Sequence, residues 1–201
     1  MGDVHQPLHN VQRYTEDRPN GDSGGNAFVI KYHYGANNLH SLWDKVLYVY
    51  RQSIKRPFTE PAFEEFGVRA QDLRESFNFT RDEVETLDFD KYIGESNEIA
   101  KIAYDNITEG SDYLPPQEYL DYFTPIARRR VALSGHRLAY MIQTLYGTPK
   151  PDDGGGDDDH KDDDAGNHDD GPSTSARYLS LSASYFISVV VLSFSTMLNY
   201  V

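Results

Sequence analysis

The chain has 201 residues, no cysteine and a formal net charge of −13 at pH 7. This length suffices for one domain with an appendage, and the lack of thiols excludes disulfides and thiolate metal sites. An acidic protein has few cations with which to displace counterions, which argues against a non-specific electrostatic binder of DNA or RNA. The objection is weaker for an enzyme that uses metal ions, because the ions bring positive charge and clustered carboxylates hold them.

The first motif is the run Gly2-Asp3-Val4-His5-Gln6-Pro7-Leu8-His9, which places one carboxylate and two imidazoles within seven residues. Pro7 excludes a regular helix through His9, so we expect a helical turn around Asp3 that ends just before the proline. Neutral imidazole combined with carboxylate, without thiolate, suits Zn²⁺. A single His or Asp is more often a surface or core group, so a metal site depends on further motifs.

A loop and a strand follow this motif. Residues 11–25 are polar and contain Asn20-Gly21 and Ser23-Gly24-Gly25, which predict a loop. Residues 27–34 are rich in aromatic and β-branched side chains and predict a short strand. We interpret His33 as a solvent-facing residue of that strand.

The run Asn38-Leu39-His40-Ser41-Leu42-Trp43-Asp44 begins a predicted helix. His40 and Asp44 are four residues apart, so on a helix their side chains point the same way from adjacent turns. We expect these two residues to border the site while Trp43 packs inward. Apolar residues continue at helical spacing, which predicts one helix as far as Ile54.

Three later stripes of apolar residues predict core helices, over residues 63–77, 92–107 and 117–146. Pro115-Pro116 opens the last helix and Gly147 ends it. We interpret Arg128-Arg129-Arg130 as the solvated face of this helix, with phosphate contact as the alternative. The predicted fold class is therefore all-α, mainly helical with a small β element.

The C-terminal part divides into two segments. Residues 148–176 contain ten Asp and two Lys, which predicts a disordered acidic linker, with weak metal binding by its Asp and His residues as the less favoured alternative. The small residues Ser173-Thr174-Ser175-Ala176, a spacer and the hydrophobic tail within residues 177–201 form the pattern of a GPI-attachment signal. A transmembrane helix is the rival interpretation, which we favour less because no Lys or Arg follows the tail.

The motifs resemble those of the S1/P1 nucleases, which are zinc-dependent single-strand nucleases and 3′-nucleotidases. That family's pattern reads G-D-x-H-Q-P-L-H, then G-G-N, then N-L-H-x-x-W-D, and this chain has all three in the same order. Weaker matches occur at Glu95-Ser96 and at Gly135-His136-Arg137-Leu138-Ala139. The resemblance covers residues 1–147 and implies a phospholipase C/P1 nuclease-like helical fold.

The resemblance also implies a site of three zinc ions. Asp3 matches the acid that bridges two of them and serves the attacking water, which makes it the candidate catalytic residue. The ligands of the remaining zinc match His9, His40 and Asp44. His5 lies in the motif but is not a ligand in the family, and we interpret it as structural or as a residue that supports the ligands.

The segment that contacts the substrate base in the family matches Gly24, Gly25 and Asn26. The family takes its other metal ligands from a segment ahead of G-D, whereas only Met1 and Gly2 precede Asp3 here. We therefore expect an incomplete form that holds one zinc and carries no signal peptide.

The implied function is zinc-dependent hydrolysis of phosphodiester bonds in single-stranded RNA or DNA, with 3′-nucleotides as further substrates. We expect a secretory route to the cell surface or the outside, with the tail as the membrane attachment and Asn78 and Asn106 as glycosylation sequons. Two alternatives stay open: an inactive, surface-anchored zinc-binding remnant and a zinc-dependent phospholipase C-like enzyme. The base contact of Gly24 to Asn26 argues against the lipase, and no protein partner is indicated.

Overall fold

The computed structural model describes residues 1–51 and 57–147. They form a mainly helical domain with one two-stranded sheet, which confirms the predicted fold class. In chain order the elements are α1 (Gly2–His5), the 3-10 helix η1 (Pro7–Asn10), β1 (Val29–His33), β2 (Ala36–Asn38), α2 (Leu39–Asp44), α3 (Glu60–Ser76), α4 (Arg81–Val84), α5 (Phe89–Ile102) and α6 (Gln117–Tyr146). The predicted acidic linker and hydrophobic tail lie outside the described residues. No helix within those described ranges is long and apolar enough to cross a membrane.

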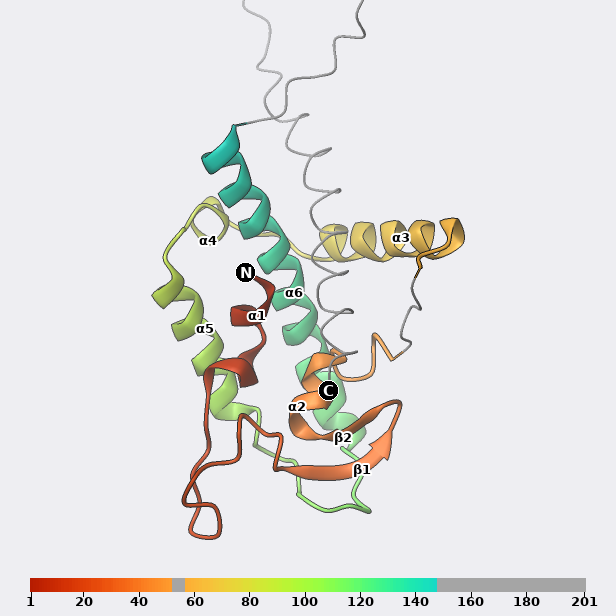
Figure 1. Ribbon diagram of the computed structural model, residues 1–201, viewed down its shortest axis with the longest axis vertical. Helices are drawn as coiled ribbons and strands as arrows, with labels where there is room; N and C mark the ends of the chain where they lie inside the picture. The colour runs from red at the N-terminus through yellow and green to blue at the C-terminus, as the bar shows by residue number, and fades with distance from the viewer. Residues whose placement is uncertain (52–56, 148–201) are drawn as a thin grey trace, which may run out of the picture.

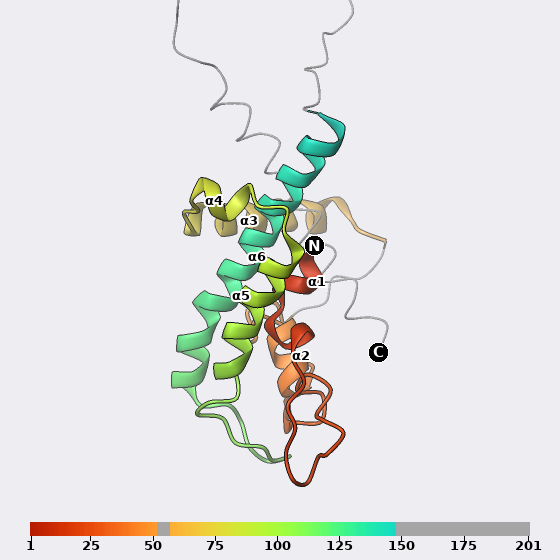
Figure 2. The same ribbon diagram turned by 90° about the vertical axis from the view of Figure 1, so that its left-hand side faces the viewer.

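The long helix α6 contacts α1, α3 and α4. Helix α5 runs beside it, the short α1 lies against both, and α3 crosses near its upper part (Figures 1 and 2). The predicted ends of α6 are confirmed, since the helix starts directly after Pro116 and stops at Gly147, whose φ is 77°. Helix α5 stops at Ile102, earlier than the sequence predicts.

The β1–β2 hairpin is antiparallel, with Val29 opposite Asn38 and His33 opposite Ala36. Strand β1 lies within the predicted strand, but β2 was not predicted, because Ala-Asn-Asn has little intrinsic preference for a strand. His33 is half-buried, with its ring centroid 5.2 Å from that of Tyr48, so it faces solvent only in part.

Helix α2 is shorter than predicted. Asn38 begins it with a capping box, and the helix ends at Asp44. The next residues turn through left-handed backbone, with φ of 49° at Val46, 53° at Leu47 and 70° at Tyr48. This conformation is unfavourable for bulky side chains, and here it directs Val46 and Leu47 into the core.

The apolar spacing that predicted a continuous helix therefore marks residues that are buried but not helical. The prediction is wrong beyond Asp44, and its last residue, Ile54, lies outside the described residues. Helix α3 follows its predicted stripe better, because Phe66, Ala70 and Leu73 are all buried.

Trp43 connects α2 to the core, as predicted. Its side chain is 2% exposed, and its indole N–H donates to the Tyr119 hydroxyl at 2.9 Å. The Tyr119 hydroxyl donates in turn to the Ala103 carbonyl at 2.7 Å. This chain of hydrogen bonds joins α2, α6 and the end of α5, and it anchors the helix that carries His40 and Asp44.

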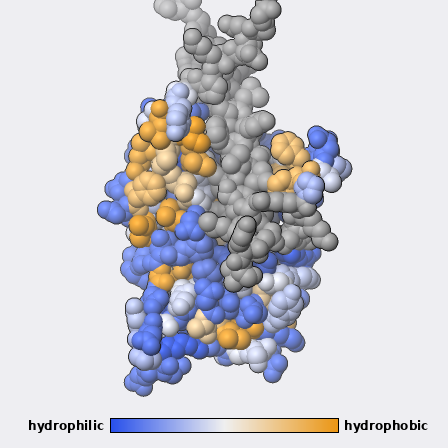
Figure 3. Space-filling view, in the orientation of Figure 1, coloured by the Kyte–Doolittle hydropathy of each residue, from blue (hydrophilic) through white to orange (hydrophobic). Residues whose placement is uncertain are grey.

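Much of the lower half of the molecule, where the loop of residues 11–25 and the hairpin lie, is hydrophilic on the face shown in Figure 3. Apolar side chains gather instead in the upper part of this face, around α4 and α5. Leu87, Phe89 and Ile93 are each at least 40% exposed.

Candidate metal centre

The structure brings His9, His40 and Asp44 together from η1 and α2. Nε2 of His9 lies 3.3 Å from Oδ1 of Asp44, and Nε2 of His40 lies 3.6 Å from Oδ2 of the same carboxylate. The two imidazole rings are stacked, with centroids 4.8 Å apart and planes 8° from parallel. One ligand atom from each of the three residues lies within 4.8 Å of the others.

These separations fit a zinc ion. Bonds of about 2.0–2.1 Å in a tetrahedron place neighbouring ligand atoms about 3.3 Å apart, close to the two imidazole–carboxylate distances. The donor set of two imidazoles and one carboxylate, without thiolate, is also one that zinc prefers. The side chains of His9, His40 and Asp44 are 17%, 18% and 22% exposed, so solvent or substrate can reach the centre.

Hydrogen bonds on the far side of each imidazole set its orientation. Nδ1 of His40 donates to the Gly24 carbonyl at 2.9 Å, which leaves Nε2 with its lone pair toward Asp44. Nδ1 of His9 lies 2.7 Å from Oδ1 of Asp3. A histidine held by a carboxylate on one nitrogen presents the other nitrogen to a metal, so both rings are prepared for coordination through Nε2.

Charge around the centre shifts two pKa values in opposite directions. Burial alone would lower the pKa of His9, but hydrogen bonds and charges from Asp44 and Asp3 outweigh it and raise the pKa. Burial alone would raise the pKa of Asp44, but His9, His40 and Gln6 outweigh it and lower the pKa. The carboxylate is therefore ionised at neutral pH, as a metal ligand requires.

Asp3 lies beside this group rather than within it. Its side chain is 53% exposed and contacts the back of His9. The three-residue group is the only cluster of potential metal ligands found among residues 1–51 and 57–147. The role of Asp3 as a bridging ligand stays a prediction, and its visible action is to orient His9.

The second motif packs between the other two. Gly24 and Gly25 are buried, whereas Asn26 is exposed. A Cβ atom on Gly24 would lie 2.2 Å from the Leu8 carbonyl oxygen, and the φ of Gly24 is +63°. Glycine is therefore required here both by space and by backbone conformation, and the close contact joins the loop to the first motif.

Comparisons with known proteins show the family of this chain. The family model described as S1/P1 Nuclease matches residues 1–147. The chain belongs to the S1/P1 nuclease family. Endonuclease 5 of Arabidopsis thaliana is 29% identical over 155 residues, which cover 73% of this chain and 48% of that protein.

Two other curated relatives match at a similar level. Endonuclease 1 of Arabidopsis thaliana is 27% identical over 157 residues, covering 73% of this chain and 47% of the relative. Endonuclease 3 of Arabidopsis thaliana is 28% identical over 162 residues, covering 75% of this chain and 50% of the relative. The chain thus spans about half the length of the curated relatives it matches. No solved structure matches it significantly.

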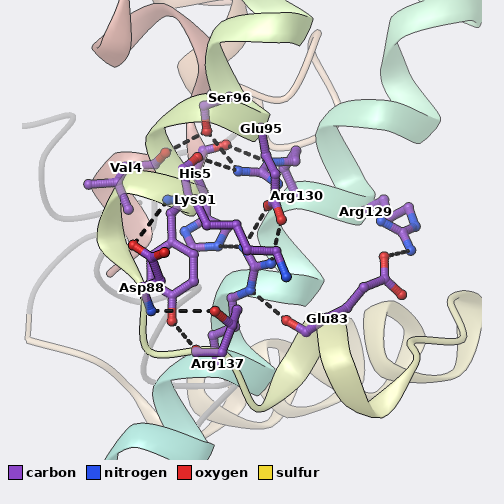
Figure 4. A network of polar contacts seen from close by, with 12 residues as sticks. Val4, His5, Glu83, Asp88, Lys91, Glu95, Ser96, Arg129, Arg130 and Arg137 are labelled. Atoms are coloured by element: carbon purple, nitrogen blue, oxygen red, sulfur yellow. Dashed lines mark hydrogen bonds and ion pairs between the residues drawn. The ribbon is translucent and has the colours of Figure 1, made fainter.

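A buried ionic network holds the first motif in place (Figure 4). The Glu95 carboxylate on α5 accepts hydrogen bonds from Arg130 at 2.7 Å and from Arg137 at 2.7 and 2.8 Å. Arg137 is fully buried and Arg130 is 5% exposed. Burial alone would raise the pKa of Glu95, but the two guanidinium groups outweigh it and bring the pKa to about 2.

The network reaches the motif through His5 and Ser96. Nη1 of Arg137 donates to Nε2 of His5 at 2.9 Å, and Nδ1 of His5 donates to the Met1 carbonyl at 2.9 Å. Burial and the nearby arginines lower the pKa of His5 to about 3, so the imidazole is neutral. The Ser96 hydroxyl accepts a hydrogen bond from the Arg130 guanidinium and donates to the Val4 carbonyl at 2.6 Å.

These contacts confirm the structural interpretation of His5. They also show that the prediction for Arg130 is wrong. Arg130 does not belong to the solvated face of the last helix, although Arg128 and Arg129 do pair near the surface with Asp72 and Glu83. Three consecutive arginines cannot all face solvent on a helix that packs on two sides. The matches at Glu95-Ser96 and around Arg137 were the signal in the sequence for this network.

Asp22 holds the loop of the second motif in place through hydrogen bonds. Its carboxylate accepts the Tyr104 hydroxyl at 2.8 Å and the Arg13 backbone N–H at 3.1 Å. Asp22 is 1% exposed, and its backbone carbonyl accepts the Ala27 N–H. Neither Asp22 nor Gln6 was predicted to have a role from the sequence, because neither belongs to the set of ligands that the motifs imply.

Proposed function

We propose that this chain takes part in zinc-dependent hydrolysis of phosphodiester bonds in single-stranded RNA or DNA, with 3′-nucleotides as further substrates. The observation that carries the proposal is the convergence of His9, His40 and Asp44 at distances that suit zinc. Membership of the S1/P1 nuclease family supplies the reaction class.

The residues around the centre have separate tasks. His9, His40 and Asp44 would hold the ion, and Asp3 fixes the orientation of His9. Zinc, when bound, supplies a Lewis acid that stabilises negative charge on the phosphate and the leaving oxygen. The loop of Gly24 to Asn26 lies against His40, so a base contacting it would be held near the scissile phosphate.

We also propose that the chain by itself is a slow catalyst. The described residues offer one group of three ligands, while the family site that the motifs imply has three zinc ions. Asp3 would serve the attacking water only where further ligands hold the metal ions beside it. Enzymes typically turn over at about 1–10³ s⁻¹, and we expect the isolated chain to fall far below that range.

The test compares cleavage of single-stranded oligonucleotides by the purified full chain with zinc, after chelation and after zinc is restored. We expect weak, zinc-dependent cleavage that His40→Ala abolishes. Extending the chain with the family's metal-binding segment ahead of Asp3 should raise the rate. No gain from that extension would favour the alternative of an inactive zinc-binding remnant, and hydrolysis of phospholipid instead would favour the phospholipase C-like alternative.

We also propose that the protein follows a secretory route. Asn78 and Asn106 are both exposed, so both sequons are accessible to glycosylation on a secretory route. The tail proposed as the membrane attachment lies outside the described residues. Deleting residues 177–201 from a secreted version should release the protein into the medium, and lipase-sensitive release of the full chain would favour a GPI anchor over a spanning helix.

A further inference from the structure

We propose that Gln6 is a positioning residue of the zinc centre, which holds the Asp44 carboxylate in the orientation that meets the metal. The inference rests on the zinc site proposed above and adds a residue outside the three ligands. Gln6 is 4% exposed and lies between Asp3 and His9 in the first motif. Its side chain thus connects the backbone of one motif to a ligand of another.

Both ends of the Gln6 amide are engaged. The side-chain oxygen accepts the backbone N–H of Leu8 as the N-cap of η1, and Nε2 donates to Oδ1 of Asp44 at 2.9 Å. The Leu8 N–H determines which way the amide faces, because an NH₂ group cannot accept that hydrogen. The NH₂ group must therefore point toward Asp44.

This hydrogen bond restricts rotation of the carboxylate. Oδ1 of Asp44, which Gln6 holds, faces His9, and Oδ2 faces His40. Without this hydrogen bond the carboxylate could rotate broadly about its last bond, and each oxygen would lose its position opposite one imidazole. A carboxylate that binds a metal through one oxygen can still accept the amide on a remaining lone pair.

The backbone anchor makes this orientation rigid. Pro7 fixes φ directly after Gln6, and Asn10 donates to the Gln6 carbonyl at 3.2 Å. The side chain of Gln6 is therefore held at its base, at its oxygen and at its nitrogen. Partners of this kind outside the ligand set typically account for a 10- to 100-fold change in metal affinity.

The experiment measures zinc affinity by chelator competition and the visible spectrum of bound Co²⁺, in the full chain. In Gln6→Asn a good N-cap for η1 is retained, but the shorter arm cannot reach Asp44. Gln6→Met removes the amide and keeps the volume. The matched control is Gln117→Met, because the Gln117 amide also donates to an aspartate, Asp121, at 2.7 Å but on the exposed surface of α6.

We expect both Gln6 variants to bind zinc 10- to 100-fold more weakly and to show a changed Co²⁺ spectrum at saturating metal, while Gln117→Met behaves as wild type. Thermal unfolding of the metal-free proteins checks that they fold, and Gln6→Asn carries the test if Gln6→Met does not. A folded Gln6→Asn with wild-type zinc affinity and Co²⁺ spectrum would overturn the inference. If wild type and His40→Ala bind metal equally, the zinc site itself is wrong, which is a distinguishable result.

Discussion

The Gly24 carbonyl accepts the Nδ1–H of His40 at 2.9 Å, so the loop proposed to contact the substrate is bonded directly to a proposed metal ligand. The Gly25 carbonyl also accepts the backbone N–H of His40 at 3.3 Å. Zinc binding at His40 should therefore depend on the position of this loop. A change in the loop should alter the centre without removing any ligand.

Gly24→Ala tests this connection. The added Cβ would lie 2.2 Å from the Leu8 carbonyl oxygen, on a residue with left-handed backbone. We expect a loss of about 2–4 kcal/mol in the free energy of unfolding and weaker zinc binding. Gly67→Ala is the control, because nothing lies within 4 Å of its Cβ position in α3, and it should stabilise by up to ~1 kcal/mol. Equal effects of the two substitutions on unfolding would contradict this assignment.

Removal of the Glu95 charge should damage the fold far more than removal of a surface charge. Glu95→Gln leaves Arg137 and Arg130 buried without a carboxylate, which typically costs about 3–5 kcal/mol. Glu98→Gln, which removes an exposed ion pair with Lys101 on the same helix, should cost less than about 1 kcal/mol. Denaturant unfolding measures both, and a Glu95→Gln variant as stable as Glu98→Gln would refute the proposed role of the network.

His5 should make stability depend on pH. Its pKa is about 3 in the folded chain and 6.5 in the unfolded one, so between these values only the unfolded chain binds the proton. Stability should therefore fall as pH falls from 6.5 toward 3, by roughly 1.4 kcal/mol per pH unit from this residue.

The measurement compares wild type with His5→Gln between pH 7 and pH 5. Glu95, with a pKa of about 2 when folded and 4.5 when unfolded, contributes to pH dependence mainly below this interval. We expect a flatter decline of the unfolding free energy in His5→Gln. Identical slopes in the two proteins would show that His5 is not held neutral by burial.

The sequence predicted those features that depend on local chemistry. Pro7 correctly placed the end of the first helical turn, and Pro116 and Gly147 placed the ends of α6. The motif residues His9, His40 and Asp44 were predicted to share a metal, and the structure brings them together.

Features that depend on tertiary packing could not be predicted from the same patterns. Val46 and Leu47 have the spacing of a helix but occupy a left-handed turn, since the core rather than local preference holds them. In the sequence Arg130 is one of three consecutive arginines and has the pattern of a surface charge. In the structure it is bound by Glu95 and Ser96, which lie on the neighbouring helix α5. The role of Gln6 depends on Asp44, which lies 38 residues away in the chain.

The most direct test of the account is the zinc content of the purified full chain at neutral pH. His9, His40 and Asp44 would supply three protein ligands, the number typical of an open zinc site, so we expect about one tightly bound ion per chain. His40→Ala should lose that ion, whereas His33→Ala, which removes a histidine from the hairpin, should retain it. Unchanged zinc content in His40→Ala would contradict the assignment of this centre.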